Sequence, residues 1–186
     1  MAFYDWPFLK CQSLSNPLDI QLRKGIRVLD IRLGMVNNRL IAFHSDSNQR
    51  ASFQEILSIV YAFLRDLQSS RETVVMSIMQ EVPDKTSRRT FSIAVRDEIL
   101  ESDGEMKMWF LENRVPRLGE VRGKVVMLSR FGEDGAGWKD GLEGMGIHPP
   151  IWPDNEKSRF SYQLKETSIR TQDWSVAAPS KGSVHL

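Results

Sequence analysis

Two segments near the start of the chain alternate hydrophobic and polar residues, which is the pattern of half-buried strands. The first is Ile26–Leu33 (IRVLDIRL), and the second is Leu40–His44 (LIAFH). Asn37 and Asn38 lie between them, and such a pair is typical of a tight hairpin turn. A short helix is predicted over residues 17–24, just before the first of these two strands. We therefore expect a helix followed by a β-hairpin.

The next hydrophobic pattern has a helical period. Ser52 is a favourable N-cap, and Glu55 three residues later completes a capping box. A helical face then carries apolar residues at Phe53, Ile56, Leu57, Val60, Phe63, Leu64 and Leu67. Lys85–Leu100 shows a second amphipathic helical pattern.

Continuous apolar runs predict buried strands between and after these helices. Thr73–Ile78 (TVVMSI) and Lys124–Leu128 (KVVML) have the β-branched-rich composition of parallel strands. A glycine-rich loop is predicted over Gly132–Gly146, and one or two further strands over Phe160–Trp174. This strand–helix alternation indicates an α/β fold with a parallel sheet. A complete eight-stranded α/β barrel needs about 250 residues, so a barrel of 186 residues would be incomplete.

Composition adds limits rather than a function. Hydrophobic residues make up 41% and charged residues 26%, as in ordinary globular proteins. With a net charge of +1, no overall field attracts nucleic acid, and phosphate contacts must come from local arginines and lysines. The single cysteine, Cys11, excludes an intrachain disulfide. The first residues lack signal-peptide features, so the expected location is cytoplasmic, and a secreted parent protein is the alternative.

Candidate catalytic residues concentrate in the first hairpin. Asp30 and Arg32 are two residues apart on one strand, so their side chains point to the same face. The returning strand ends at His44. A carboxylate, a guanidinium and an imidazole together can orient a general acid and neutralise a phosphate. However, Asp-x-Arg on a strand is also a common structural ion pair, and the spacing alone leaves both interpretations open.

The order of several segments resembles a known family. These segments are QLRKGIRVLDIRL, LIAFHS, SFQEILSIVYAFL, RETVVMSI, WFLENRVPRLGEVRGKVVMLSRF and TQDW. In this order and spacing they resemble the X domain of bacterial and fungal-type phosphatidylinositol-specific phospholipases C. The resemblance extends from Met1 to about Trp174. It implies a catalytic domain over residues 1–176, with a disordered tail at 177–186.

The resemblance implies a fold, a reaction and roles for five residues. The fold is a distorted TIM-type (β/α) barrel, here incomplete. The reaction cleaves inositol phospholipid to diacylglycerol and cyclic inositol phosphate, using two histidines as base and acid. His44 matches the general acid, Asp30 the carboxylate of the site, and Arg32 the arginine that stabilises phosphate in metal-independent members. Arg130 and Asp173 match residues that contact inositol.

The same resemblance implies the partners and cofactors. Calcium-dependent relatives need a carboxylate at the position of Arg32, whereas a guanidinium supplies positive charge itself and repels a cation. We therefore expect no metal and no other cofactor. The implied partner is phosphatidylinositol or a related inositol phospholipid, with transient contact to a membrane surface and a role in lipid metabolism.

The chain departs from the family pattern at several positions. In the family, a Gly-Thr-His type motif carries the general base and stands just before the residues that match Met1–Trp6. This motif has no match in the sequence. Met79 stands where a lysine is usual, and Ser175 where a tyrosine is expected. A methionine is a poor hydrogen-bonding partner for a sugar hydroxyl. An alternative hypothesis is therefore a catalytically inactive, truncated remnant that at most binds an inositol-phosphate head group.

A third hypothesis is a glycerophosphodiester phosphodiesterase, which also has a barrel and a carboxylate-bearing strand followed by a histidine. Enzymes of that family carry a metal-binding Glu-x-Asp pattern. The sequence Asp30-Ile31-Arg32 does not match this pattern, so this hypothesis ranks last. Outside the hairpin, His148 precedes two prolines in a loop, and a structural role is expected for it.

Overall fold

The computed structural model describes residues 16–44, 47–81, 86–102, 106–153 and 158–172. In chain order the elements are α1 (Leu18–Arg23), β1 (Val28–Val36), β2 (Arg39–His44), β3 (Ser47–Ser52), α2 (Phe53–Arg65), β4 (Thr73–Gln80), α3 (Arg88–Glu101), the 3₁₀ turn η2 (Met106–Met108), β5 (Trp109–Phe110), η3 (Leu118–Glu120), β6 (Lys124–Arg130), η4 (Gly141–Gly144), β7 (Phe160–Leu164) and β8 (Thr167–Thr171). The tail predicted at 177–186 lies outside the described residues.

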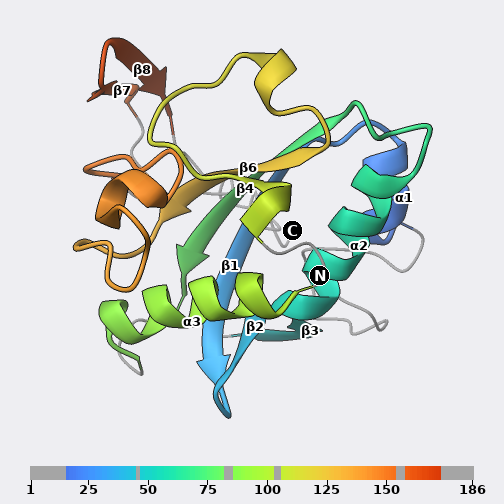
Figure 1. Cartoon of the computed structure of the whole chain (residues 1–186). Helices are drawn as coiled ribbons and strands as arrows, with labels where there is room; N and C mark the ends of the chain where they lie inside the picture. The colour runs from blue at the N-terminus through green and yellow to red at the C-terminus, as the bar shows by residue number, and fades with distance from the viewer. Residues whose placement is uncertain (1–15, 45–46, 82–85, 103–105, 154–157, 173–186) are drawn as a thin grey trace, which may run out of the picture.

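A six-stranded sheet organises the fold, in the order β3-β2-β1-β4-β6-β5. Strands β1, β4, β6 and β5 are parallel. At one edge of the sheet, β2 pairs antiparallel with β1, and β3 pairs antiparallel with β2. The four predicted strands of residues 26–33, 40–44, 73–78 and 124–128 therefore lie in one sheet, which confirms the α/β prediction. A separate two-stranded hairpin, β7-β8, lies beyond the main sheet (Figure 1).

Local sequence signals set several boundaries. Asn37 and Asn38 have φ angles of 51° and 61°, as a tight turn between right-twisted strands requires. The capping box of α2 is present, because Ser52 Oγ accepts from Glu55 N at 3.2 Å and Glu55 Oε2 accepts from Ser52 N at 2.7 Å. Helix α3 begins three residues later than predicted, with Ser87 as its N-cap.

One face of the sheet packs against α2 and α3, which lie in front of it in Figure 1. Buried side chains of this layer include Leu29, Leu33, Val74, Met76, Ile78, Val125 and Met127 from the strands, and Phe53, Ile56, Leu57, Val60, Phe91, Val95 and Ile99 from the helices. Fully burying a side chain of this size contributes about 1.5–3 kcal/mol. This core fixes the register of the strands, and the register places the site residues on the other face.

The opposite face of the sheet is more polar. Because side chains alternate along a strand, it carries Asp30 and Arg32 from β1, Ser77 and Met79 from β4, and Arg130 from β6. A smaller apolar cluster of Phe110, Val121 and Val126 covers part of this face near β5.

Segment 132–146 is a loop, as predicted, and contains the short turn η4. Trp138 Nε1 donates to Ser92 Oγ at 3.1 Å, which fastens the loop to α3. Gly135 has φ +64°, and a Cβ there would lie 2.3 Å from the backbone of Gly141, so a side chain is excluded. The loop is thus a packed structure rather than a loose connection.

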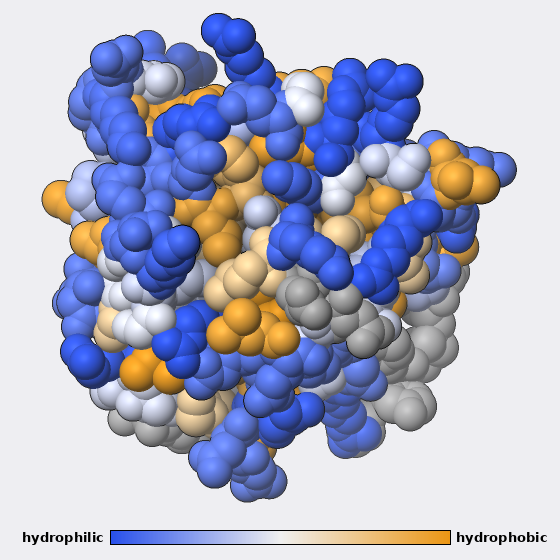
Figure 2. Space-filling view, in the orientation of Figure 1, coloured by the Kyte–Doolittle hydropathy of each residue, from blue (hydrophilic) through white to orange (hydrophobic). Residues whose placement is uncertain are grey.

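Small apolar areas are interspersed in a mainly hydrophilic surface in the view of Figure 2. Within the described residues, no helix has both the length and the apolar character needed to cross a membrane.

Candidate active site

Parallel pairing arranges the site residues in two rows across β1, β4 and β6. Asp30 is paired with Ser77 in the first row. In the second row Arg32 is paired with Met79, and Met79 with Arg130. Residues paired in this way point to the same side of the sheet. The register alone therefore brings together side chains that are up to 100 positions apart in the sequence.

The Asp30 carboxylate is the centre of this group. Its Oδ2 accepts from Arg32 Nε at 3.0 Å. Its Oδ1 accepts from Arg130 at 3.3 Å and from the Ser77 hydroxyl at 3.2 Å. Arg130 is the most buried charged member, with a side chain only 6% exposed. Asp30 therefore compensates a guanidinium that would be costly to bury alone.

Glu81 adds a second carboxylate, 3.7 Å from Arg32. The charges of Asp30 and Glu81 offset those of the two arginines, so anion binding here depends on directed N–H groups rather than on net charge. A guanidinium has five N–H donors in a planar fork. One arginine can thus contact a carboxylate and a phosphate oxygen at the same time, which is the chemistry expected of a phosphate site.

An aromatic ring lies beside this cluster. The Arg130 guanidinium is 4.6 Å from the ring centre of Trp152, within the range of a cation–π interaction. Phe160 packs edge-on against Trp152 at 5.3 Å. Sequence reasoning did not assign Trp152 to the site, because a lone tryptophan in a proline-containing loop has no pattern that separates binding from packing.

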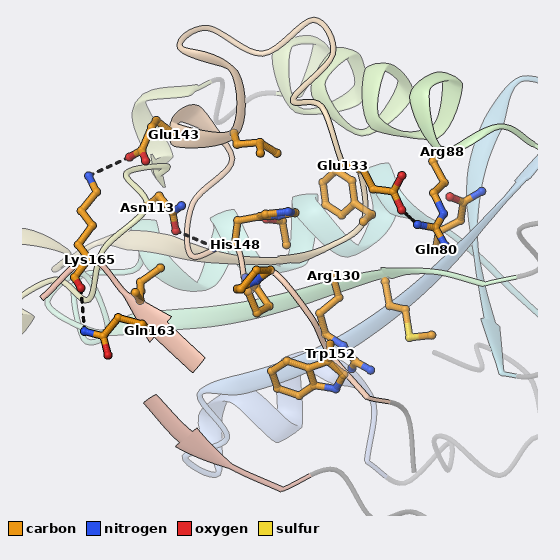
Figure 3. Close-up of a pocket in the computed structure, with 18 residues that line it drawn as sticks. Gln80, Arg88, Asn113, Arg130, Glu133, Glu143, His148, Trp152, Gln163 and Lys165 are labelled. Atoms are coloured by element: carbon orange, nitrogen blue, oxygen red, sulfur yellow. Dashed lines mark hydrogen bonds and ion pairs between the residues drawn. The ribbon is translucent and has the colours of Figure 1, made fainter. Parts of the chain in front are cut away.

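A cavity of about 800 Å³ opens next to Arg130, at the carboxyl ends of β4 and β6 (Figure 3). Met79 and Arg130 line it from the sheet, Trp152 from the loop, and Lys165 from the β7-β8 hairpin. The carboxyl ends of parallel strands are where barrel enzymes place their active sites.

His148 also lines this cavity. Its Nδ1 is 2.9 Å from Ser129 Oγ, and its backbone N–H donates to Asn113 Oδ1 at 2.9 Å. Burial lowers the pKa of the His148 imidazole below its ordinary value, which favours the neutral ring. These two anchoring contacts agree with the structural role expected from the sequence.

The structure does not join His44 to the Asp30 cluster. His44 is exposed at the end of β2, and the regular β1–β2 pairing stops two residues earlier, at Leu33 and Ala42. Among the described residues, no hydrogen bond or ion pair links His44 to Asp30, Arg32 or Arg130, so its catalytic role stays a prediction. Asp173 lies outside the described residues.

Three of the five predicted site residues, namely Asp30, Arg32 and Arg130, thus converge. Within the part of the chain that the structure describes, no group of three or more His, Cys, Asp and Glu side chains is arranged to hold a metal ion.

Comparisons with known proteins bear on this site. Residues 8–131 match the family of the phosphatidylinositol-specific phospholipase C, X domain. A 1-phosphatidylinositol phosphodiesterase of Listeria monocytogenes is 28% identical over 130 residues, which is 66% of this chain and 37% of that protein.

Solved structures of a phosphatidylinositol-specific phospholipase C of Staphylococcus aureus share the fold. Two of them have TM-scores of 0.63 and 0.64, are 22% identical, and cover 83% of this chain. The matched region is 51% of each S. aureus chain. The chain thus spans about half the length of these structures and about a third of the Listeria enzyme.

Proposed function

Because the chain belongs to the phosphatidylinositol-specific phospholipase C X-domain family, we propose that it carries the phosphate-binding part of a phosphodiesterase site. The reaction is the cleavage of an inositol phospholipid to diacylglycerol and a cyclic inositol phosphate, in lipid metabolism. The observation that supports this most is the pair of arginines held on Asp30.

Each residue has a role in this proposal. Arg32 neutralises the phosphate charge that grows in the transition state. Asp30 positions both guanidiniums, and Ser77 fixes the carboxylate. His44 protonates the diacylglycerol oxygen as the P–O bond breaks.

Inositol recognition is assigned to Arg130 and Asp173. No general base is assigned among the described site residues, so the proton of the attacking hydroxyl would pass to water rather than to a positioned side chain. A general acid or base contributes about 10²–10⁴-fold, and we therefore expect very slow turnover.

A second candidate function is head-group binding without catalysis. It is favoured by Met79, which lies in register between Arg32 and Arg130. A thioether is at most a weak acceptor, so the middle of the phosphate-facing row offers no donor to a ring hydroxyl.

The test is a cyclic inositol phosphate release assay on the purified chain with phosphatidylinositol in mixed micelles. His44→Ala should lower the release rate by about 10²-fold or more, and added imidazole should restore part of it. Arg122→Ala, on an exposed arginine outside the site, is the control and should match the unmodified chain. Binding of inositol 1-phosphate without any product would favour the second candidate, and neither binding nor product would refute both.

A further inference from the structure

The Phe43 ring lies on the face of the sheet that carries the site. Gly34 follows Arg32 by two residues on β1, so a side chain at residue 34 would point to the same face as Arg32. A Cβ atom placed on Gly34 would lie 3.0 Å from Cδ2 and 3.1 Å from Cε2 of the Phe43 ring. The ring therefore fills the space that a side chain at residue 34 would take, beside Arg32.

Gly34 makes room for this ring and does not serve an unusual backbone. It lies in the regular part of β1, and its φ is outside the left-handed region that favours glycine. A Cβ at 3.0 Å is closer than most real contacts, so an alanine at residue 34 would force the ring to shift. Gly34 and Phe43 therefore form a matched pair, in which a missing side chain admits an aromatic ring.

An irregularity in β2 precedes the Phe43 side chain. Regular pairing with β1 stops at Leu33 and Ala42, and the pairing of β2 with β3 shifts its register between Ile41 and Phe43. Bulges of this kind redirect side chains next to active sites. Phe43 is half-buried, so its ring lies at the margin of the site rather than in the closed core.

The ring closes one of two directions that the Arg32 side chain could take along β1. Towards the start of the strand, Arg32 Nε donates to Asp30 Oδ2 at 3.0 Å. Towards its end, the next place on the same face is that of Gly34, which the ring fills. Alternate residues of a strand are about 7 Å apart, a distance that an arginine side chain can span. Without the ring, Arg32 could therefore turn away from Asp30.

Glu81 borders the same space. Its carbonyl oxygen would lie 3.6 Å from a Cβ at residue 34, and its carboxylate is 3.7 Å from Arg32. The Phe43 ring and Glu81 thus bound the Arg32 side chain beyond Asp30, and the side chain is only 27% exposed. Its orientation is set by packing as well as by charge.

We propose that Phe43 is a positioning residue, whose ring over Gly34 keeps the Arg32 guanidinium on Asp30 in the orientation that meets the phosphate. The role of Arg32 towards phosphate rests on the proposed function. Phe43 acts only through Arg32. Ordering a side chain with many rotamers at the moment of binding costs affinity, so a ring that orders Arg32 beforehand raises the affinity for the phosphate.

Four substitutions in the full chain test this role. Phe43→Ala removes the ring, whereas Phe43→Leu keeps much of its apolar volume. Gly34→Ala retains the ring but forces it to move. Gly119→Ala is the matched control, because a Cβ at that residue meets nothing within 4 Å. Calorimetry measures the Kd for inositol 1-phosphate, and ¹⁵N relaxation measures the order parameter of the Arg32 Nε–H group without ligand.

Phe43→Ala and Gly34→Ala should each raise the Kd about two- to tenfold, the cost of ordering one such side chain. Both should also lower the order parameter of the Arg32 Nε–H group. Phe43→Leu and Gly119→Ala should stay close to the unmodified chain in both measurements. In the Arg32→Met chain, which lacks the guanidinium, Phe43→Ala should leave the Kd unchanged.

An order parameter of Arg32 that stays unchanged in Phe43→Ala and in Gly34→Ala would overturn the proposal. So would a loss of affinity on Phe43→Ala that is equal with and without the Arg32 guanidinium, because the ring would then act on the whole fold. If Phe43→Ala does not fold, Gly34→Ala and Phe43→Leu still give both measurements.

The proposed function fails separately. If inositol 1-phosphate does not bind the unmodified chain while Arg32 loses order in Gly34→Ala, the phosphate assignment is wrong and the positioning of Arg32 stands. If inositol 1-phosphate binds and Arg32 keeps its order in the variants, the phosphate site stands and the role of Phe43 is refuted.

Discussion

At the scale of single residues, Asp30 determines what the site can do. It accepts from Arg32, Arg130 and Ser77, so one carboxylate sets the direction of two guanidiniums. Arg130 is held between this carboxylate and the ring of Trp152. Preorganised donors of this kind bind an anion with little loss of side-chain entropy.

The first prediction concerns the Arg130 side chain. Arg130→Met keeps much of the side-chain length but removes the donors, and hydrogen bonds to charged groups contribute about 1.5–3 kcal/mol. The Kd for inositol 1-phosphate should therefore rise by roughly tenfold or more, as measured by calorimetry. Arg122→Met is the matched control, and the assignment is wrong if both variants bind like the unmodified chain.

A second prediction follows from Glu98 of α3. Its Oε1 accepts from Leu40 N at 2.7 Å, and burial raises the pKa of this carboxyl above the ordinary 4.5. Compared with the unfolded chain, the folded state favours the protonated form of Glu98. Protonated Glu98 therefore contributes to the free energy of unfolding, and this contribution is fully present below the ordinary pKa. It is lost as pH rises through the raised pKa.

Glu98→Gln should remove this loss and increase the free energy of unfolding near pH 7 by about 1 kcal/mol. The gain should shrink towards pH 4. Urea denaturation at several pH values measures it. Glu166→Gln, at an exposed residue between β7 and β8, should show no such trend, and a Glu98→Gln effect that is independent of pH would contradict the explanation.

At the scale of elements, helix α2 is the main cover of the sheet core, and its start is fixed by Ser52. The capping box satisfies backbone N–H groups that the helix itself cannot pair. The same residue also ends β3. The cap therefore fixes the point at which the chain turns from β3, which pairs with the His44-bearing strand β2, into helix α2.

Ser52→Ala should lower the free energy of unfolding by about 1 kcal/mol, the usual cost of losing an N-cap. Ser58→Ala, at an exposed position within α2, is the control and should be neutral or slightly stabilising, since alanine favours helix. Chemical denaturation compares the two, and equal effects would show that the cap does not act as described.

At the scale of the whole molecule, the sheet has one face covered by helices and one face that carries the site. The site face brings Arg32 and Arg130 together on Asp30, so the oxygens of this carboxylate already accept from guanidinium N–H groups. Calcium sites need several oxygen ligands instead.

We therefore expect binding of inositol 1-phosphate, and any cyclic product release, to be unchanged by a chelator or by added calcium. Calorimetry with and without a calcium chelator checks the binding. Arg32→Asp is the informative variant, because it restores a carboxylate at this position. A calcium requirement in the unmodified chain would refute the metal-independent assignment, whereas one that appears only in Arg32→Asp would support it.

Much of this fold follows from local sequence patterns. The alternating residues 26–33 and 40–44, the Asn37–Asn38 turn and the Ser52–Glu55 capping box each express a rule that acts within a few residues. Asp30, Arg32 and Arg130 were also found from the sequence, through the family resemblance. Strand β3 was not predicted, because its sequence SNQRAS has no hydrophobic alternation and depends on pairing with β2.

Only the tertiary structure decided how these parts meet. The contact between Asp30 and Arg130 depends on the parallel register of three strands, which is set by long-range packing on α2 and α3. The cavity and the place of Trp152 depend on how a glycine-rich loop and a hairpin fold over the strand ends. Local patterns specify which residues form a strand or a helix, whereas the distances between side chains of different elements arise only when the whole core is packed.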